Sequence, residues 1–198
     1  TLGRWFKKEI NGIEHDVTLT DGAELYFMTN GATTFTVDFT VITTKATPYF
    51  AVSIDGKEPV RHLITESTVT LPDASRHAVR IIADGLTETE GKWKEERGFA
   101  IKDIYVNAGK MKAIYPTNDI IFYYGDSITE GINAFGTSGN SNTNSATNSY
   151  AYHSAKELEA IPYIIGYGGT GVLSVGSFNT FIKAIDNLSQ ARADTDTT

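Results

Sequence analysis

The segment IIFYYGDSITEG, residues 120–131, decides the fold of the second half of the chain. Its first five residues are apolar or aromatic without a break, which is typical of a strand buried on both faces of a parallel sheet. Gly125 permits a sharp bend, so Ser127 follows directly after the carboxyl end of the strand. Because open α/β sheets bind ligands at this end, the pattern makes Ser127 a candidate nucleophile.

The same residues have a second interpretation, as the start of a helix. Ser127 and Glu130 have the spacing of a capping box, in which both side chains bind backbone N–H groups of the first turn. Ser127 would then be the N-cap, and Glu130 a capping partner rather than an acid–base group. Both interpretations place backbone N–H groups around Ser127. Asp126 is expected to hydrogen-bond the turn or a neighbouring loop.

The composition is that of a globular protein with a substantial core. Of the 198 residues, 40% are hydrophobic and 21% are charged. The net charge of −7 is spread along the chain and disfavours nucleic acid and anionic membranes as partners. There is no cysteine, which excludes a disulfide framework and thiolate chemistry. No apolar stretch approaches the length of a membrane span, and none has the pattern of a signal peptide.

The first 112 residues have the pattern of a β-sandwich. Residues 33–41 alternate with period two, with phenylalanines and valines on one face and polar side chains on the other. Asp55 and Gly56 form a strong hairpin-turn signal. Short strands separated by frequent turns predict a sandwich of the jelly-roll kind without a helix. We expect its strands at residues 23–28, 33–41, 49–54, 60–64, 67–71, 77–83 and 99–106.

The pattern changes between residues 109 and 119, where glycine, proline and asparagine punctuate the chain. We therefore expect a β-sandwich at residues 1–112 and the beginning of an α/β domain at residues 117–198. This second part is predicted to hold strands, helices and one long polar surface loop. The strands are expected at 120–124 and 161–165, the helices at 149–160 and 178–188, and the loop at 135–148.

The second part has one further helical pattern and an irregular carboxyl-terminal segment. In its first helix, Tyr150, His153 and Leu158 recur at helical spacing. Residues 191–198 are polar and have no regular pattern. Two strands do not make a stable parallel sheet, because such sheets need more strands and cover on both faces. The chain is therefore expected to stop in the middle of this domain, unless the missing strands come from elsewhere.

Two glycine-containing segments carry a family resemblance. The run GDSITEG at residues 125–131 resembles the first sequence block of the SGNH (GDSL) hydrolases. The run IIGYGGTG at residues 164–171 resembles their second block. A β-rich module in front of such a domain is similar to the two-domain carbohydrate esterases of family two, which deacetylate plant polysaccharides.

This resemblance implies a fold, a reaction and site residues. It implies a three-layer α/β/α domain of the flavodoxin-like kind, incomplete here, and a serine esterase that removes acetyl groups from carbohydrates. Ser127 matches the nucleophile, whose N–H also belongs to the oxyanion hole. Gly169 best matches the second oxyanion donor, with Gly171 as the alternative, and Gly125 and Asp126 support the turn. No metal or organic cofactor is implied, the partner is an acetylated carbohydrate, and an extracellular or cell-surface location is favoured.

Two further motifs of the family are absent from the chain. These are Gly-x-Asn-Asp, which supplies another oxyanion donor, and Asp-x-x-His, which supplies the base. We expect both to follow after Thr198 and the chain as it stands to be inactive. The histidines of the chain are interpreted as structural, and the handedness of the crossover places the last of them away from the strand ends. They are His15, His62, His77 and His153.

Two other functions are compatible with the sequence. Gly166, Gly168 and Gly171 satisfy the dinucleotide-binding fingerprint after a strand. The acidic residue that should follow at the end of the next strand is missing, because Asp186 lies inside a predicted helix. Alternatively, the sandwich is a carbohydrate-binding module that stacks sugars on aromatic rings, and Trp93 in a charged loop is the best candidate contact. Tryptophan in a sandwich is more often part of the core or its rim.

Overall fold

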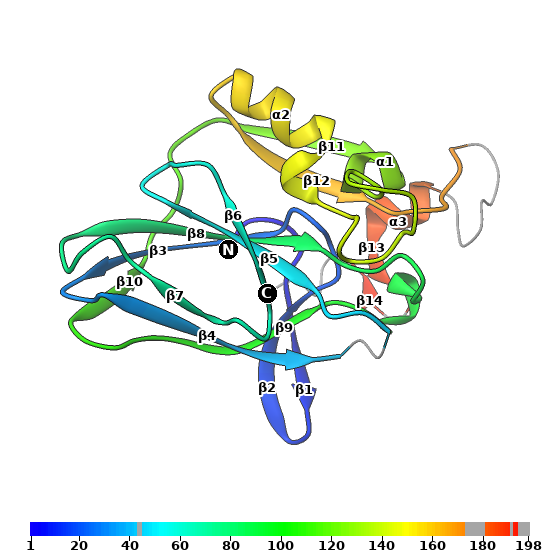
Figure 1. Cartoon of the computed structure of the whole chain (residues 1–198). Helices are drawn as coiled ribbons and strands as arrows, with labels where there is room; N and C mark the ends of the chain where they lie inside the picture. The colour runs from blue at the N-terminus through cyan, green and yellow to red at the C-terminus, as the bar shows by residue number, and fades with distance from the viewer. Residues whose placement is uncertain (43–44, 173–180, 191, 194–198) are drawn as a thin grey trace.

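The computed structural model describes residues 1–42, 45–172, 181–190 and 192–193. Its first half is a sandwich of two five-stranded sheets, as predicted (Figure 1). One sheet has the strand order β1-β2-β9-β4-β7 and the other the order β10-β3-β8-β5-β6. The strands are β1 (Phe6–Ile10), β2 (Ile13–Thr18), β3 (Glu24–Asn30), β4 (Thr34–Val41), β5 (Tyr49–Ile54), β6 (Val60–Leu63), β7 (Thr68–Thr70), β8 (His77–Gly85), β9 (Phe99–Val106) and β10 (Lys110–Ala113).

Alternating side chains of β4 build the middle of this sandwich. Phe35 and Val37 are fully buried, and β4 pairs antiparallel with β9, which places Phe35 opposite Val106. Phe27 of the other sheet meets Phe35 edge to face, with ring centroids 5.3 Å apart. Full burial of one such side chain stabilises the fold by about 1.5–3 kcal/mol. The period-two pattern in the sequence therefore corresponds to real inward and outward faces.

Two tight turns close hairpins in the sandwich. Asp55 and Gly56 have φ angles of 54° and 74°, as the predicted turn requires. Asn11 and Gly12 have φ angles of 53° and 76° and join β1 to β2. The sequence analysis did not mark this second hairpin, because β1 and β2 carry many charged residues and lack a clean apolar alternation.

Besides β1 and β2, two further elements of the sandwich lie where the prediction placed none. Strand β10 pairs with β3 and carries the sandwich to Ala113, into the segment interpreted as a domain boundary. A short 3-10 helix, η1 (Lys92–Lys94), interrupts the region expected to be free of helix. Its residues are strongly charged, so the apolar periodicity that identifies helices is absent there.

The second half begins with a parallel pair of strands and their crossover, as predicted. Strands β11 and β12 pair in register from Ile120 opposite Ile161 to Gly125 opposite Gly166. The elements are β11 (Ile120–Gly125), α1 (Ser127–Glu130), η2 (Ala146–Asn148), α2 (Tyr150–Glu157) and β12 (Ile161–Gly166). Helix α2 contacts β12 and also packs on the outer face of the sandwich, where Tyr152 joins Ala51 and Ile82 (Figure 1).

The face of α2 that packs is not the predicted one. Tyr150 and Leu158 are exposed, whereas Ala151, Tyr152 and Ala155 are buried. The small alanines permit close approach to β12, while Tyr152 reaches the sandwich. The spacing of the larger side chains was therefore misleading, because this helix is covered on two sides by different partners.

The prediction that β11 is buried on both faces is wrong for the described part of the chain. Ile120, Phe122 and Tyr124 point to one side and are 42%, 53% and 46% exposed. Phe122 stacks on Tyr163 of β12, with ring centroids 4.7 Å apart. Strand β12 is largely buried by contrast. Within the described residues, β11 pairs with β12 alone, and the side chains of this aromatic face are exposed.

The polar segment at residues 135–148 also departs from its prediction. It was interpreted as a surface loop, yet Asn144 and Ser145 are fully buried. Arg61 donates to the carbonyl oxygen of Asn144 at 2.7 Å, and the Ser145 hydroxyl donates to Asp84 of β8 at 3.0 Å. Polar groups can be buried when each finds a partner, and here the sandwich supplies those partners.

The end of the described chain is partly helical. Residues 181–186 form α3 (Phe181–Asp186), while 187–189 form β13 (Asn187–Ser189), which pairs with β14 (Arg192–Ala193). The predicted helix at 178–188 is therefore too long at its carboxyl end, and its first three residues lie outside the described ones. Two residues of the segment expected to be irregular, Arg192 and Ala193, form β14. No helix among the described residues is long and apolar enough to cross a membrane.

Candidate active site

The two glycine-containing turns lie side by side at the carboxyl ends of β11 and β12. The N–H of Tyr167 donates to the carbonyl oxygen of Gly125 at 3.0 Å, which continues the strand pairing into the turns. A Cβ atom added to Gly168 would lie 3.4 Å from the Cβ of Ser127. Ser127 is half-buried. The parallel pairing therefore brings Ser127 against the second turn, although 40 or so residues separate them in the chain.

Asp126, not Ser127, caps helix α1. A carboxylate oxygen of Asp126 accepts a hydrogen bond from the N–H of Ile128 at 3.0 Å. The structural role predicted for Asp126 is thus present, and the interpretation of Ser127 as the N-cap is wrong. Gly125 is required here as well, because a Cβ on it would overlap the side chain of Thr129. The hydroxyl of Ser127 is consequently not needed to start the helix.

The second turn contains the predicted oxyanion donor in a glycine-specific conformation. Gly169 has a φ of 73°, and the N–H of Thr170 closes the turn on the carbonyl oxygen of Tyr167 at 3.3 Å. Glycine is favoured at this turn position because side chains resist positive φ. Gly171, the alternative donor, follows the turn. The role of the Gly169 N–H as an oxyanion donor stays a prediction.

A cluster of buried charges lies behind these turns. Glu130 is fully buried and accepts hydrogen bonds from Lys92 and from the N–H of Gly168, the latter at 2.8 Å. A guanidinium nitrogen of Arg97 is 3.7 Å from the same carboxylate. Asp21 is also fully buried and accepts from the N–H of Leu86 at 2.9 Å. The prediction that Glu130 belongs to a capping box is therefore wrong, because its carboxylate points inward.

Burial changes the proton affinities in this cluster. Desolvation raises the pKa of Asp21 to about 8, although the charge of Arg97 opposes the rise. Desolvation lowers the pKa of Lys92, and the negative charge of Glu130 opposes that fall. The geometry of a charged ammonium between a carboxylate and a carbonyl oxygen favours the protonated form of Lys92.

Glu88 of the sandwich reaches the front of the site. Its carboxylate occupies the space where a side chain on Gly168 would be, beside Ser127. Burial, and then the nearby charge of Glu130, raise the pKa of Glu88. Sequence patterns did not indicate that Glu88 lies beside Ser127, or that Lys92 and Asp21 lie in the charge cluster around Glu130. In the sequence, only the high charge of the segment around Trp93 distinguishes this loop from its neighbours.

Trp93 packs against the second turn rather than projecting from a free loop. Its ring meets Tyr167 edge to face, with centroids 5.9 Å apart, and it is half-buried. A small cavity beside it is lined by residues from both halves of the chain, including Glu88, Gly168 and Thr170. Trp93 therefore lies next to the candidate site, where a contact with substrate remains a prediction.

The histidines lie away from these turns in engaged or exposed positions. His15 contacts Thr40 at 2.7 Å within the sandwich, and His62 stacks on Phe50. His77 lies 2.7 Å from Asp55. His153 is exposed on α2. Among the described residues, no group of three metal-binding side chains could hold an ion.

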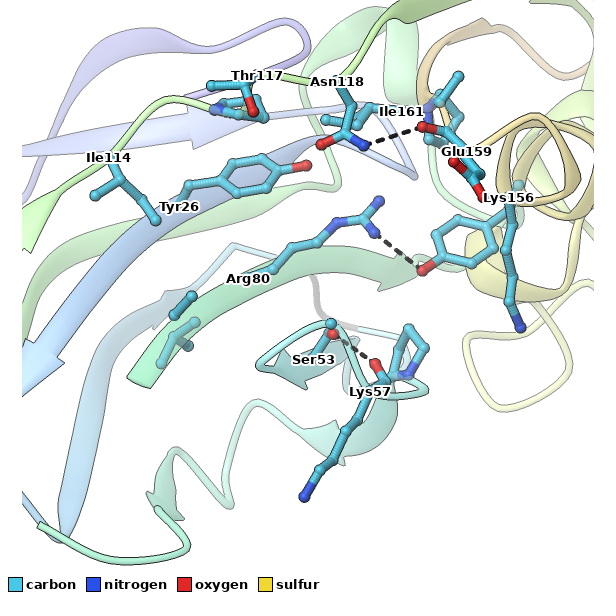
Figure 2. A pocket seen from close by; sticks show the side chains of 18 of the residues that line it. Tyr26, Ser53, Lys57, Arg80, Ile114, Thr117, Asn118, Lys156, Glu159 and Ile161 are labelled. Carbon is cyan, nitrogen blue, oxygen red and sulfur yellow. Dashed lines mark hydrogen bonds between the residues drawn. The ribbon is translucent and has the colours of Figure 1, made fainter. Parts of the chain in front are cut away.

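A larger cavity of about 460 Å³ lies at the other end of the parallel pair (Figure 2). It is bounded by β3 and β8 of the sandwich, by the segment that joins the two halves, and by α2 with the start of β12. Figure 2 shows Arg80 donating to the hydroxyl of Tyr152, at 3.2 Å, and Asn118 donating to the carbonyl oxygen of Glu159, at 3.0 Å. Its size alone does not make it the active site, because Ser127 and the glycine turns are elsewhere.

No protein-family model matches the chain, and no curated protein matches it. Several solved structures do. A family two carbohydrate esterase from Cellvibrio japonicus has a TM-score of 0.69 and 20% identity, and the match covers 95% of this chain and 56% of that protein. An acetyl xylan esterase from the rumen bacterium Butyrivibrio proteoclasticus has a TM-score of 0.66 and 18% identity, over 100% of this chain and 53% of that protein.

A third similar structure is a family two carbohydrate esterase from Clostridium thermocellum in complex with cellohexaose. It has a TM-score of 0.62 and 22% identity, over 86% of this chain and 51% of that protein. The chain thus spans little more than half the length of these proteins. The likeness to family two carbohydrate esterases inferred from the two motifs is confirmed at the level of the fold.

Proposed function

We propose that this chain carries the sandwich and the nucleophile-bearing part of a serine esterase that removes acetyl groups from carbohydrates. The observation that supports this most is the contact between the Ser127 turn and the Gly168–Gly169 turn. An ester hydrolase needs a nucleophile beside preorganised backbone N–H groups, and this contact brings the two together. The similarity in fold to carbohydrate esterases supports the same class of substrate.

In this mechanism Ser127 Oγ attacks the carbonyl carbon of the acetyl ester. The carbonyl oxygen becomes an oxyanion, and the N–H groups of Ser127 and Gly169 donate to it. Asp126 maintains the backbone turn that carries Ser127 by capping α1. The general base accepts the Ser127 hydroxyl proton and gives it to the leaving sugar oxygen, so the sugar departs as an alcohol, and water then hydrolyses the acetyl-serine. No step requires a metal or an organic cofactor.

The base is proposed to be a histidine outside residues 1–198. His15, His62 and His77 are engaged within the sandwich, and His153 is on the exposed side of α2. A three-layer α/β/α domain would supply the missing strands and this histidine, and it would cover the exposed face of β11. Trp93 and Thr170 beside the site are the proposed contacts for the sugar ring.

Replacement of the nucleophile tests this proposal. In a polypeptide that includes the proposed histidine, Ser127→Ala should lower kcat for an aryl acetate and for acetylated xylan by about 10³-fold or more. Ser138→Ala, an exposed serine in the neighbouring loop, is the matched control and should retain full activity. Equal activity of Ser127→Ala and wild type would refute the esterase assignment. Serine-dependent hydrolysis by residues 1–198 alone would refute the location of the base.

A further inference from the structure

Lys92 of the sandwich reaches across to the turn that follows β12. Its ammonium group donates to the carboxylate of Glu130 and to the carbonyl oxygen of Gly166, the latter at 2.6 Å. The same nitrogen lies 4.2 Å from the ring centroid of Tyr167. The side chain of Lys92 is only 6% exposed. One buried cation from the first half of the chain thus binds groups of the second half.

Glu130 completes this link by binding the backbone that follows Tyr167 in the chain. One of its carboxylate oxygens accepts from Lys92, and the other accepts from the N–H of Gly168 at 2.8 Å. The ion pair therefore binds the backbone on both sides of Tyr167, at the carbonyl group before it and the N–H group after it. Charge-assisted hydrogen bonds of this kind are shorter and stronger than neutral ones.

Glu130 also belongs to the same helical turn as Ser127. Helix α1 spans only Ser127–Glu130, so the two residues stand at its two ends. A shift of the Glu130 carboxylate would therefore move the Gly168–Gly169 turn relative to Ser127. A Cβ on Gly166 would overlap the Glu130 side chain, which shows how closely the two are packed.

A buried ion pair is a costly way to stabilise a fold, because both charges lose their hydration. Apolar side chains of similar volume would hold the two halves together at least as well. They would not orient a backbone carbonyl group and a backbone N–H group at the same time. This difference favours a role for the ion pair in controlling the geometry of the turn over a purely structural role.

We propose that the Lys92–Glu130 ion pair is a positioning device that sets the second glycine turn against Ser127. On this view the sandwich contributes to the geometry of the active site, because its 3-10 helix η1 carries Lys92. Neither side chain touches the reacting atoms, so both are positioning residues. The inference rests on the proposed function of Ser127 and Gly169.

The kinetic test compares two buried ion pairs in a polypeptide that includes the proposed histidine. The double variant Lys92→Met/Glu130→Gln removes both charges while keeping an acceptor for the Gly168 N–H. It should lower kcat for an aryl acetate by about 10- to 100-fold, with KM changed by less than about threefold, because orientation rather than binding is lost. The matched control is Arg80→Met/Glu24→Gln, which removes a buried pair far from Ser127.

Thermal unfolding separates positioning from stability. The two double variants should unfold at similar temperatures, while only the Lys92/Glu130 variant loses kcat. Wild-type kcat in a folded Lys92→Met/Glu130→Gln protein would overturn the proposal. An equal loss of kcat in the Arg80/Glu24 control would also overturn it, since the effect would then be general.

A measurement without turnover keeps this inference distinct from the esterase assignment. In residues 1–198, the amide proton of Gly168 should resonate downfield, and in Glu130→Gln it should move upfield because a neutral oxygen is a weaker acceptor. An unchanged Gly168 resonance would overturn the positioning role even if Ser127 proves essential. A shifted resonance together with a fully active Ser127→Ala protein would instead overturn the proposed function on which the inference rests.

Discussion

The two ends of the parallel strand pair meet the sandwich in opposite ways. At the carboxyl end, charged and polar side chains of both halves are buried against each other, with Glu130 and Asp21 fully enclosed. At the amino end, the same two halves leave a cavity of about 460 Å³ between them (Figure 2). Arg80 lines this cavity and pairs with the buried Glu24, while Lys156 and Glu58 pair at an exposed rim.

This contrast indicates that the carboxyl end of the strand pair has the more fixed geometry. Buried charges are tolerated only when their partners are held at short distances, so the carboxyl end must be closely packed. A nucleophile and its oxyanion donors need that same constancy of position. The amino end has the larger cavity, but the candidate nucleophile Ser127 and the two glycine turns lie at the other end.

The largest expected difference between the two ends is in the free energy of unfolding that is lost when a glycine is replaced by alanine. Gly131 ends α1 with a φ of 80°, and a Cβ on it would overlap the carbonyl oxygen of Ser145. Gly131→Ala should lower the free energy of unfolding by at least about 3 kcal/mol, because backbone must move.

Gly56 at the cavity is the matched control for this substitution. Its φ is 74°, but a Cβ on it would meet no atom within 4 Å. Gly56→Ala should therefore cost only about 1 kcal/mol, from conformational strain. Chemical denaturation of both variants measures the difference. Equal losses would mean that the carboxyl end is no more tightly packed than the amino end.

An intermediate effect is expected in the pH dependence of stability. The pKa of Asp21 is raised by burial to about 8, so the folded state holds a proton that the unfolded chain releases near its ordinary pKa of 3.8. In that pH window the contribution of Asp21 to stability falls as the pH rises. Relative to wild type, Asp21→Asn should therefore become more stable as the pH is raised from 5 to 8.

Asp55, near the cavity, should show the opposite sign. The hydrogen bond from His77 holds the pKa of Asp55 below its ordinary value. Its contribution to stability is present at neutral pH and is lost as the pH falls through the folded pKa. Denaturation midpoints of Asp21→Asn and Asp55→Asn between pH 3 and pH 8 check both signs. The same pH trend in the two variants would contradict this account of Asp21.

The smallest effect is expected at the rim of the cavity. The Lys156–Glu58 pair is exposed, and such pairs contribute little because water screens them. Lys156→Ala should change the free energy of unfolding by no more than about 0.5 kcal/mol. Lys92→Ala at the buried end should cost more, about 1–3 kcal/mol, because it removes a buried hydrogen-bond donor to Glu130 while Arg97 stays 3.7 Å from that carboxylate. A loss at Lys156 as large as that at Lys92 would remove the contrast between the two ends.

Much of the fold was predictable because it is encoded in short stretches. Period-two alternation in residues 33–41 corresponds to β4, and the Asp55–Gly56 signal corresponds to a hairpin turn. The apolar run before Gly125 corresponds to β11 and places Ser127 just after the strand. Hydrophobic periodicity and turn chemistry act over a few residues, so they can be recognised without knowing what packs on them.

The interpretation of burial was less reliable, because burial depends on distant partners. Asn144 and Ser145 lie in a segment whose composition predicts a surface loop, yet Arg61 and Asp84 of the sandwich satisfy their polar groups inside. The helix α2 buries alanines that carry no strong hydrophobic signal, since β12 needs a close approach. Neither outcome can be derived from local pattern.

The candidate site likewise contains residues that a local pattern identifies and residues that only tertiary packing brings together. Ser127 and the glycine turns are recognisable from sequence, because a buried strand followed by glycine and serine has a local meaning. Glu88 meets Ser127, and Lys92 and Asp21 join the charge cluster around Glu130, only when the sandwich packs on the strand ends. Charge pairing acts through space between residues far apart in the chain, so the candidate nucleophile could be identified from its own segment, while the charged residues around the glycine turns required the tertiary structure.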